Sequence, residues 1–391
     1  MSALVQKFQG IANDANAIFA EREVEVEISQ LAMLSGQNAF FIGEPGTAKS
    51  AVARFLAKKV VGARWFSTQL DPQSPKDAVL GPVDTKRLLD ASEYVHNTAH
   101  MLPDSHFATL DELGQASPDT TLSLAGLLNP EERSYHELGR EVTTPLTAVF
   151  ATSNELLHPV TQKKIWDRFT LRRIVSEIEA PEEFERVILG YSATGDDGAP
   201  LILSDESVSL AEFEEAREEV SRVTVPRERA QEVREIHYLL RGEGVLVSSR
   251  TWGAIVGDIK LGTDERRTSV LKAMAWLDGR DTVTSEDLTI LRHALWSTPD
   301  QIRVIAKVVG DVADPIIRTS EALVGQCIDI MRSLTPASHL DDLRTMEGQL
   351  GALRGDAGCL TPGRSTNAAR REIQKAILRV KGAITTRQRR G

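Results

Sequence analysis

A glycine-rich turn that ends in a lysine and a serine is the clearest chemical signal in this sequence. The turn, residues 43–50 (GEPGTAKS), follows a short apolar run and precedes a stretch whose apolar residues have helical spacing. A strand, a glycine turn, Lys-Ser and a helix can form a phosphate cradle, because the N–H groups of the turn and the helix N-terminus both attract an anion. In such a cradle Lys49 would reach the β- and γ-phosphates of a nucleotide, and Ser50 would ligate Mg²⁺.

One position of the turn departs from the full pattern G-x-x-x-x-G-K-[ST]. Ala48 stands where the pattern has its second glycine, directly before Lys49. Alanine costs little at this position if the residue has a negative φ. A chance glycine turn between a strand and a helix would explain the same letters, so the assignment depends on the motifs that follow.

Two adjacent carboxylates end a second apolar run. Asp111 and Glu112 follow the mostly apolar residues 106–110. At the end of a strand beside the phosphate cradle, Asp111 would orient Mg²⁺ and Glu112 would activate the attacking water. A buried strand that ends in a solvated Asp-Glu turn is the structural alternative, and the pair gains weight only together with the glycine turn.

Three polar side chains further along could complete a site for phosphoryl transfer. Asn154 ends a third apolar run, where it could hydrogen-bond a γ-phosphate or the attacking water. Arg168 offers a planar guanidinium that is always protonated, which suits charge on a transferring phosphoryl group. Arg250, near the start of a helical stretch, could project back toward a nucleotide. Each residue also has an interpretation without function. Asn154 could belong to a polar turn, and Arg168 to a solvated basic turn that includes Arg172 and Arg173. Arg250 could be an exposed residue in the first turn of a helix.

These residues need a scaffold, and the pattern around them predicts an open, mostly parallel α/β sheet. Residues 39–42, 64–70, 106–112 and 146–154 have strand-like composition and are separated by helical stretches. The N-terminal residues 1–36 read as helical and end at a glycine. Residues 81–103 are predicted to be an insertion that contains a helix or a hairpin.

Composition divides the chain into three predicted domains. Residues 191–200 are rich in Gly, Asp and Ser, which places a boundary there. We expect an α/β nucleotide-binding domain in residues 1–190, an all-α domain in 191–298 and a helical extension in 299–391. The extension ends in a basic amphipathic helix, which would either pack as a solvated helix or bind an acidic partner or a nucleic acid.

The overall composition is that of an ordinary globular protein and argues against some classes. The chain has 391 residues, of which 26% are charged and 41% hydrophobic, and a formal net charge of −10. The negative charge argues against a protein whose whole surface grips nucleic acid. No apolar stretch is long enough to span a bilayer, no signal sequence is evident, and two cysteines make no disulfide framework. We therefore expect a cytoplasmic protein with reduced thiols.

Taken in order, these motifs resemble those of an AAA+ ATPase, most closely of the MoxR branch and its RavA-like members. Residues 43–50 resemble the Walker A element, and MoxR-type loops often carry alanine where Ala48 stands. Leu110-Asp111-Glu112 matches the Walker B element. The resemblance implies an AAA+ P-loop domain with a mostly parallel sheet, followed by an all-α lid and a helical C-terminal extension.

The same resemblance assigns the three isolated polar residues. Asn154 falls where the family has sensor 1, Arg168 in the segment that carries the arginine finger, and Arg250 at the start of sensor 2. Residues 81–103 lie where this branch has its helix-2 insert, and residues 141–145 lie where it has a hairpin insert. Family membership, rather than the residues themselves, carries most of the weight for these three roles.

The resemblance also implies an activity, cofactors and partners. It implies hydrolysis of ATP with Mg²⁺ in a homo-oligomeric ring, expected to be a hexamer, in which Arg168 comes from the neighbouring subunit. The ring would remodel or mature a partner protein, and the usual partners in this branch contain a von Willebrand factor A domain. The expected catalytic residues are Glu112, Asn154, Arg168 and Arg250. The expected nucleotide-binding residues are Gly43, Glu44, Pro45, Gly46, Thr47, Ala48, Lys49, Ser50 and Asp111, with Ser50 and Asp111 as metal ligands.

Other functions stay open at this point. A nucleic-acid motor or loader would use the basic C-terminal helix as its grip. A nucleotide-switched assembly scaffold would bind ATP and barely hydrolyse it. A motor subunit of the metal-chelatase kind would share the inserts. The β-rich partner-binding domain of RavA-like proteins has no counterpart in residues 299–391, which are expected to be helical throughout.

Overall fold

The chain forms two compact units, each built from several stretches of sequence. The computed structural model describes residues 2–156, 163–188, 203–257, 268–313, 315–335, 338–360 and 364–390. The first unit comprises Met1–Ser176, Ile202–Val225 and Ser248–Val283, and the second comprises Glu177–Leu201, Pro226–Val247 and Thr284–Gly391. These units differ from the three consecutive domains expected from the sequence, because the chain alternates between them. The boundary predicted at residues 191–200 lies outside the described residues.

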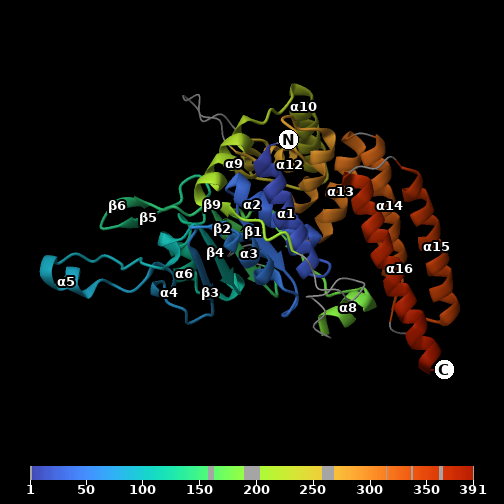
Figure 1. Ribbon diagram of the computed structural model, residues 1–391, viewed down its shortest axis with the longest axis horizontal. Coiled ribbons are helices and arrows are strands. Elements are labelled where there is room, and N and C mark those ends of the chain that lie inside the picture. The colour runs from blue at the N-terminus through green and yellow to red at the C-terminus, as the bar shows by residue number, and fades with distance from the viewer. Residues whose placement is uncertain are drawn as a thin grey trace. The chain divides into compact units, whose positions relative to one another are not determined.

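A five-stranded parallel sheet forms the centre of the first unit (Figure 1). Its strands, in the order β3-β4-β7-β1-β8, are parallel in every neighbouring pair. Their bounds are β1 (Ala39–Ile42), β3 (Trp65–Gln69), β4 (Phe107–Asp111), β7 (Ala148–Ser153) and β8 (Leu171–Ile174). The parallel α/β sheet predicted from the sequence is confirmed. Because β1 lies between β7 and β8, its carboxyl end has a parallel neighbour on each side.

The sequence predicts four of these strands and misses β8. Arg172 and Arg173 occupy its middle, and a solvated basic turn does not describe them. Arg172 is 3% exposed, with its guanidinium 4.8 Å from the ring centre of Trp166. Arg173 donates from Nε to Oε1 of the buried Glu25 (3.1 Å). The two charges conceal the apolar run by which a buried strand is usually recognised.

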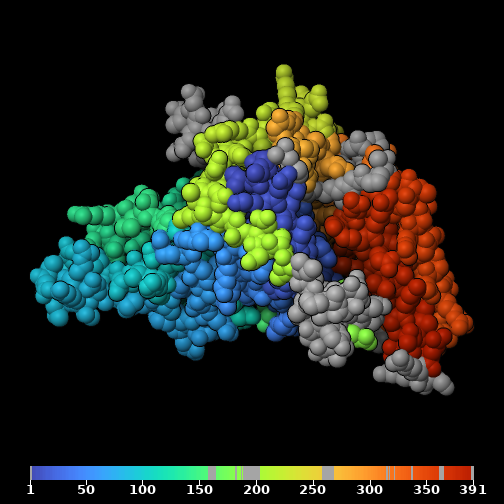
Figure 2. All heavy atoms as spheres, in the orientation of Figure 1, coloured from blue at the N-terminus to red at the C-terminus, as the bar shows by residue number. Residues whose placement is uncertain are grey.

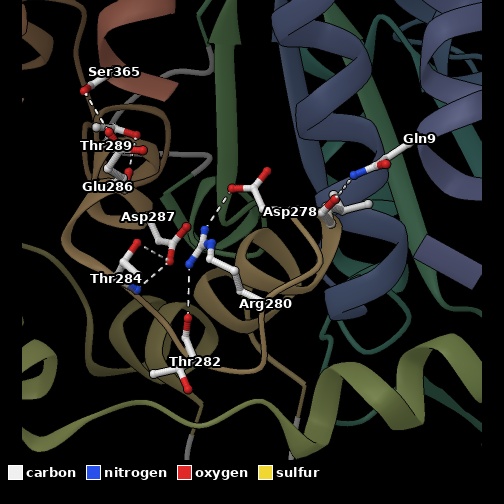
Figure 3. Close-up of polar contacts among 10 residues, drawn as sticks. Gln9, Asp278, Arg280, Thr282, Thr284, Glu286, Asp287, Thr289 and Ser365 are labelled. Carbon is white, nitrogen blue, oxygen red and sulfur yellow. Dashed lines mark hydrogen bonds and ion pairs between the residues drawn. The ribbon is translucent and has the colours of Figure 1, made fainter. Parts of the chain in front are cut away.

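Helices of the first unit pack on the sheet and on one another. They include α1 (Ala3–Ile18), α2 (Glu23–Ser35), α3 (Lys49–Lys58), α9 (Leu210–Arg222), α11 (Ser249–Val256) and α12 (Val270–Leu277). Phe8 of α1 packs edge-on against Trp276 of α12, whose Nε1 donates to Glu219 of α9 (2.8 Å). Gln9 donates to the carbonyl oxygen of Leu277 (2.7 Å; Figure 3). Part of the stretch expected to form a separate all-α domain therefore shares a core with the N-terminal helices.

Smaller elements complete the scaffold of the first unit. The short strands β2 (Val60–Val61) and β9 (Val208–Ser209) pair in parallel. Helix α6 (Pro118–Ser123) begins after Ser117, whose hydroxyl accepts from the Thr120 N–H as an N-cap. The short helices η2 (Leu113–Gln115) and α7 (Lys163–Trp166) follow β4 and precede β8.

Two insertions project together from the sheet side of the first unit (Figures 1 and 2). One holds α4 (Asp77–Leu80), α5 (Thr85–Ala91) and η1 (Leu102–Asp104), which confirms a helix within residues 81–103. The other is an antiparallel hairpin of β5 (Ser134–Glu137) and β6 (Arg140–Thr143). His96 links them, because its Nδ1 lies 2.8 Å from Oε1 of Glu137. The α5 tip is the cyan point at the left of both pictures.

The second unit is helical among its described residues, as the sequence predicts for residues 299–391. It contains α8 (Pro181–Ile188), α10 (Arg227–Gly242), η4 (Ser285–His293), α13 (Asp300–Val312), α14 (Pro315–Arg332), α15 (Leu340–Cys359) and α16 (Arg364–Arg390). A core that includes Leu323, Leu350 and Ile377 joins α14, α15 and α16. Thr284 and Asp287 form a capping box (Figure 3) at the start of η4, which is a 3₁₀ helix.

The basic helix α16 is partly neutralised within the second unit. Arg379 lies 3.4 Å from a carboxylate oxygen of Glu179, and Lys381 lies 3.8 Å from one of Glu347. The apolar face of α16, with Ile373, Ile377 and Val380, is buried in the core of this unit, as the packed-helix interpretation expects. Among the described residues, none of the helices has the length and apolar content that a bilayer crossing requires.

Candidate functional site

The glycine turn lies between β1 and α3, as the sequence predicts. Gly43 has φ 158°, and a Cβ added there would lie 2.3 Å from the carbonyl oxygen of Val175, so only glycine fits. Gly46 has φ 83°, in the left-handed region that favours glycine. Helix α3 begins at Lys49. The turn therefore presents its backbone and a helix N-terminus at the carboxyl edge of the sheet, which is where anions bind in such folds.

Ala48 does not have the negative φ that would make alanine inexpensive. Its φ is 61° and its ψ is 18°, which is the left-handed conformation. For a residue with a Cβ this conformation costs about 1–2 kcal/mol. The carbonyl oxygen of Ala48 accepts from the N–H groups of Ala51 and Val52, so this backbone geometry starts the helix. The general pattern has glycine here because the position requires a positive φ.

Lys49 is held inside the turn by backbone oxygens. Its side chain Nζ donates to the carbonyl oxygens of Gly43 (2.6 Å) and Glu44 (2.7 Å), and the residue is 7% exposed. Burial lowers the pKa of Lys49, while the carboxylates of Glu112, Asp111 and Glu44 act in the opposite direction. The ammonium is thus positioned beside the turn by groups that a phosphate oxygen could replace.

Asp111 joins the turn to two neighbouring strands. Its Oδ1 accepts from the hydroxyl of Ser50 (2.7 Å) and from the hydroxyl of Thr152 (2.7 Å). Ser50 and Asp111, the predicted metal ligands, are therefore in contact. Thr152 was not predicted from the sequence, although it lies two residues before Asn154 and its strand, β7, adjoins β4. Oxygen ligands of this kind, few in number and completed by phosphate and water, suit Mg²⁺.

The described residues offer no alternative metal centre. None of their His, Cys, Asp and Glu side chains gather in groups of three or more that could hold a metal. A magnesium ion bound by one hydroxyl, one carboxylate and phosphate oxygens does not need such a group. The donor set at Ser50 and Asp111 therefore fits the cofactor that the sequence predicts.

Most of the predicted residues line one cleft of about 620 Å³, although Gly43 and Glu44 do not. Its wall includes residues 45–50 of the turn, Asp111, Glu112, Thr152 and Asn154. Glu112 has φ 54°, a strained conformation of the kind that recurs at functional sites. Arg54, Phe55 and Lys58 of α3 also line the cleft and were not singled out from the sequence. The volume is within the range of small-molecule sites, roughly 300–1,000 Å³.

Arg168 and Arg250 do not line this cleft. Arg168 lies in the turn after α7, where its carbonyl oxygen accepts from Asn38 (2.9 Å). Its Nη1 is buried and has no hydrogen-bond acceptor among the described residues. Arg250 is the second residue of α11 and is half-buried. Within one chain, the structure brings together the turn, the carboxylates and Asn154, but not these two arginines.

Arg22 holds the glycine turn in place through hydrogen bonds, and this role was not predicted from the sequence. It is 3% exposed, and its guanidinium donates to the carbonyl oxygens of Thr47 (2.9 Å), Ser176 (2.8 Å) and Glu21 (2.7 Å). These bonds fix the turn against the segment that follows β8. Nothing in the sequence around Arg22 indicates this role, because Thr47 and Ser176 lie 25 and 154 positions away.

Models of two known domains match this chain. The model described as the MoxR domain in the MoxR-vWA-beta-propeller ternary systems matches residues 6–199. A model described as an AAA lid domain matches residues 265–309. The first match contains the whole cleft and Arg168, whereas Arg250 lies between the two matches.

Known proteins resemble the chain over most of its length. Two uncharacterised proteins of Methanocaldococcus jannaschii are 27% and 28% identical over 314 and 291 residues, which are 80% and 74% of this chain and 76% and 72% of those proteins. The crystal structure of a candidate ATPase from Cytophaga hutchinsonii has a TM-score of 0.58 at 18% identity, covering 78% of this chain and 94% of that one. At this identity the structural likeness speaks for the fold alone.

Proposed function

Because the chain belongs to the MoxR family of AAA+ ATPases, we propose that it hydrolyses ATP in a homo-oligomeric ring and thereby remodels a partner protein. The observation that carries the proposal is the contact of Ser50, Asp111 and Thr152 beside the glycine turn. It joins the first residues of α3 to the ends of two strands where a triphosphate would lie. The narrower RavA-like resemblance stays a prediction.

The turn would bind the phosphates of ATP. The N–H groups of residues 43–50 and the N-terminus of α3 would face the phosphate oxygens. Lys49 would exchange the carbonyl oxygens of Gly43 and Glu44 for β- and γ-phosphate oxygens. Mg²⁺, held by Ser50 and Asp111, would supply positive charge against the developing phosphate charge.

The cleft also holds the groups that hydrolysis needs. Glu112, which follows the predicted metal ligand, would take a proton from the attacking water. Asn154 would orient that water, since both residues line the same cleft as the turn. Thr152 would hold the Asp111 carboxylate in place, so we assign it a positioning role.

A second subunit would complete the site. Arg168 lies outside the cleft of its own chain. We assign Arg168 to the neighbouring subunit's ATP, which makes hydrolysis depend on a ring, expected to be a hexamer. Arg250 is assigned to the γ-phosphate in cis on the family resemblance alone.

The matched family model suggests the kind of partner. That model describes MoxR domains in ternary systems with a von Willebrand factor A protein and a β-propeller protein. We propose partners of these two classes for this chain.

Mixing two inactive variants tests the ring site. We expect Arg168→Ala to retain ATP binding and to lose turnover by about 10³–10⁵-fold, as arginine fingers do elsewhere. Lys49→Ala should lose turnover because it no longer binds ATP. Mixed rings should regain activity, because an Arg168→Ala subunit keeps an intact cleft that a Lys49→Ala neighbour can complete. Arg140→Ala, an exposed residue of β6, is the control and should keep full turnover.

The outcomes of this mixing experiment are distinct. Turnover by Arg168→Ala at the wild-type rate would reject the finger. If turnover is lost and mixing does not restore it, Arg168 has a structural role within its own chain, and the proposal of a site shared between subunits fails. ATPase activity is measured with saturating Mg²⁺ and at protein concentrations where size-exclusion chromatography shows the ring.

A further inference from the structure

A second cavity of about 320 Å³ lies at the opposite edge of the same sheet. His106 and Thr147, which line it, directly precede β4 and β7, and Gly36 lies shortly before β1. Arg133 and Arg217 also line it. All of these residues belong to the first unit. The cavity is therefore separate from the nucleotide cleft, which lies at the carboxyl ends of the strands.

Arg133 places a buried positive charge in this cavity. The residue is 8% exposed, and its Nη2 donates to the carbonyl oxygens of Gly36 (3.0 Å) and Thr147 (2.8 Å) and to Oδ1 of Asn38 (2.9 Å). These acceptors are neutral, and no ion pair to Arg133 is found among the described residues. Burial, and then the charge of Arg217, lower the pKa of Arg133 to about 9. A buried cation without a counter-charge is costly unless an anion compensates it.

Arg217, on α9, adds a second guanidinium beside the first. A Cβ added at Gly36 would lie 3.0 Å from Nη2 of Arg217, and the carbonyl oxygen of the same glycine accepts from Arg133. The two like charges thus meet at one residue. Arg217 donates from Nη1 to Glu214 (3.3 Å), but its Nε is buried and has no acceptor among the described residues. One guanidinium donor therefore remains to be satisfied.

His106 contributes a neutral donor to the same cavity. Its Nδ1 accepts from the backbone N–H of Arg64 (3.0 Å), which assigns the ring proton to Nε2. Burial, followed by the charge of Arg64, lowers the pKa of His106, whereas the carboxylates of Glu214 and Asp104 act in the opposite direction. The imidazole is therefore neutral at pH 7, with an N–H group to donate.

We propose that this cavity binds a phosphate group, either as free phosphate or as part of a small phosphorylated molecule. The lining includes two guanidiniums, those of Arg133 and Arg217, and one carboxylate, that of Glu214, so the cavity carries a net positive charge. The Nε–H of Arg217 and the imidazole N–H of His106 are available as donors to phosphate oxygens. Arg133 adds positive charge, since its Nη1 and Nη2 already donate to protein oxygens. The volume of about 320 Å³ leaves room for an organic part beside the phosphate. The site requires neither ATP nor a ring.

Phosphate titration of matched variants tests this site. All proteins carry Lys49→Ala, so that the glycine turn contributes little phosphate binding. We expect isothermal titration calorimetry to detect inorganic phosphate bound by this background protein. Arg217→Gln should weaken binding about 10- to 100-fold, because a charge-assisted hydrogen bond is lost. Arg222→Gln is the matched control on the same helix, since Arg222 pairs with Glu218 (2.9 Å) away from the cavity, and it should leave binding unchanged.

A second variant separates ligand binding from a purely structural role. Glu214→Gln removes the one carboxylate that the described residues place in the cavity wall, and it should tighten phosphate binding severalfold. A structural ion pair between Glu214 and Arg217 predicts no such gain. If Arg217→Gln fails to fold by circular dichroism, the Glu214→Gln titration decides the question by itself.

The choice of probe distinguishes the source of the phosphate. Tighter binding of glycerol phosphate than of inorganic phosphate would assign the site to a phosphorylated metabolite, and the reverse order would assign it to the free ion. The proposal is overturned if neither probe binds, if acetate binds as tightly as phosphate, or if Arg217→Gln and Arg222→Gln bind phosphate equally well.

Discussion

The two edges of the central sheet each hold a buried cation, but in opposite electrostatic settings. At the carboxyl edge, Lys49 lies among carboxylates, and those of Glu112, Asp111 and Glu44 counteract the effect of burial on its pKa. At the amino edge, Arg133 lies beside Arg217, whose charge adds to the effect of burial and lowers the Arg133 pKa further. The same sheet thus presents one cation with internal counter-charges and one without.

The difference in counter-charge suits the carboxyl edge to catalysis and the amino edge to structural stability and anion binding. A group that must exchange partners during turnover benefits from a second charge of opposite sign nearby, which keeps it ionised between events. Arg133 makes its hydrogen bonds to neutral oxygens of four surrounding residues and has no reason to move. We therefore expect substitutions at the amino edge to affect stability and anion binding, and substitutions at the carboxyl edge to affect turnover.

Arg133→Met should give the largest loss of stability. The change leaves the carbonyl oxygens of Gly36, Leu127 and Thr147 without their donor. With about 1–3 kcal/mol for each unsatisfied buried group, less what rearrangement recovers, we expect a loss of about 3–5 kcal/mol. Thermal unfolding followed by circular dichroism measures the effect. An unchanged melting temperature would show that Arg133 does not hold this edge together.

Thr152→Val should reduce turnover without comparable loss of ATP binding. The substitution removes the hydroxyl that donates to Asp111, a hydrogen bond to a charged group. Such bonds contribute about 1.5–3 kcal/mol, so kcat should fall at least about tenfold. Thr109→Val is the control, because the Thr109 hydroxyl on β4 is buried and has no hydrogen-bond partner among the described residues. Equal kcat values for the two valine variants would remove Thr152 from its positioning role.

Ala48→Gly should produce the smallest effect, a gain in stability. The left-handed conformation of Ala48 costs about 1–2 kcal/mol, and the greater freedom of glycine in the unfolded chain takes back about half. We expect a net gain of about 0.5–1 kcal/mol. Gly46→Ala is the inverse test, since Gly46 has φ 83° and no atom within 4 Å of an added Cβ, so only the backbone conformation is probed. If Ala48→Gly lowers the melting temperature, alanine is not strained at this position.

The carboxyl edge could be predicted from the sequence because its residues are consecutive. Gly43 to Ser50 are consecutive in the glycine turn and the start of α3, and Asp111 and Glu112 are adjacent at the end of β4. Residue types and their spacing therefore identify both groups. Asn154 follows by the same logic, because parallel strands bring their carboxyl ends to one edge. Thr152 escaped notice because a threonine inside an apolar run reads as an ordinary strand residue.

The amino edge could not be predicted, because its residues come from distant parts of the chain. Gly36, Arg133 and Arg217 meet only after the sheet and α9 have packed, and none belongs to a motif. Arg22 and β8 were missed for a related reason, since buried arginines look like surface residues in a sequence. The division into two units was also hidden, because composition marks linkers and not the return of the chain to an earlier core.

The most direct test of the account compares ATP binding with ATP hydrolysis in Glu112→Gln. The side chain keeps its size but can no longer accept the proton of the attacking water. We predict that this variant binds ATP with wild-type affinity in an equilibrium titration while its turnover falls at least about 100-fold, the lower end of a general base's contribution. Hydrolysis by Glu112→Gln at the wild-type rate would contradict the account, because the cleft would then not be where the chemistry occurs.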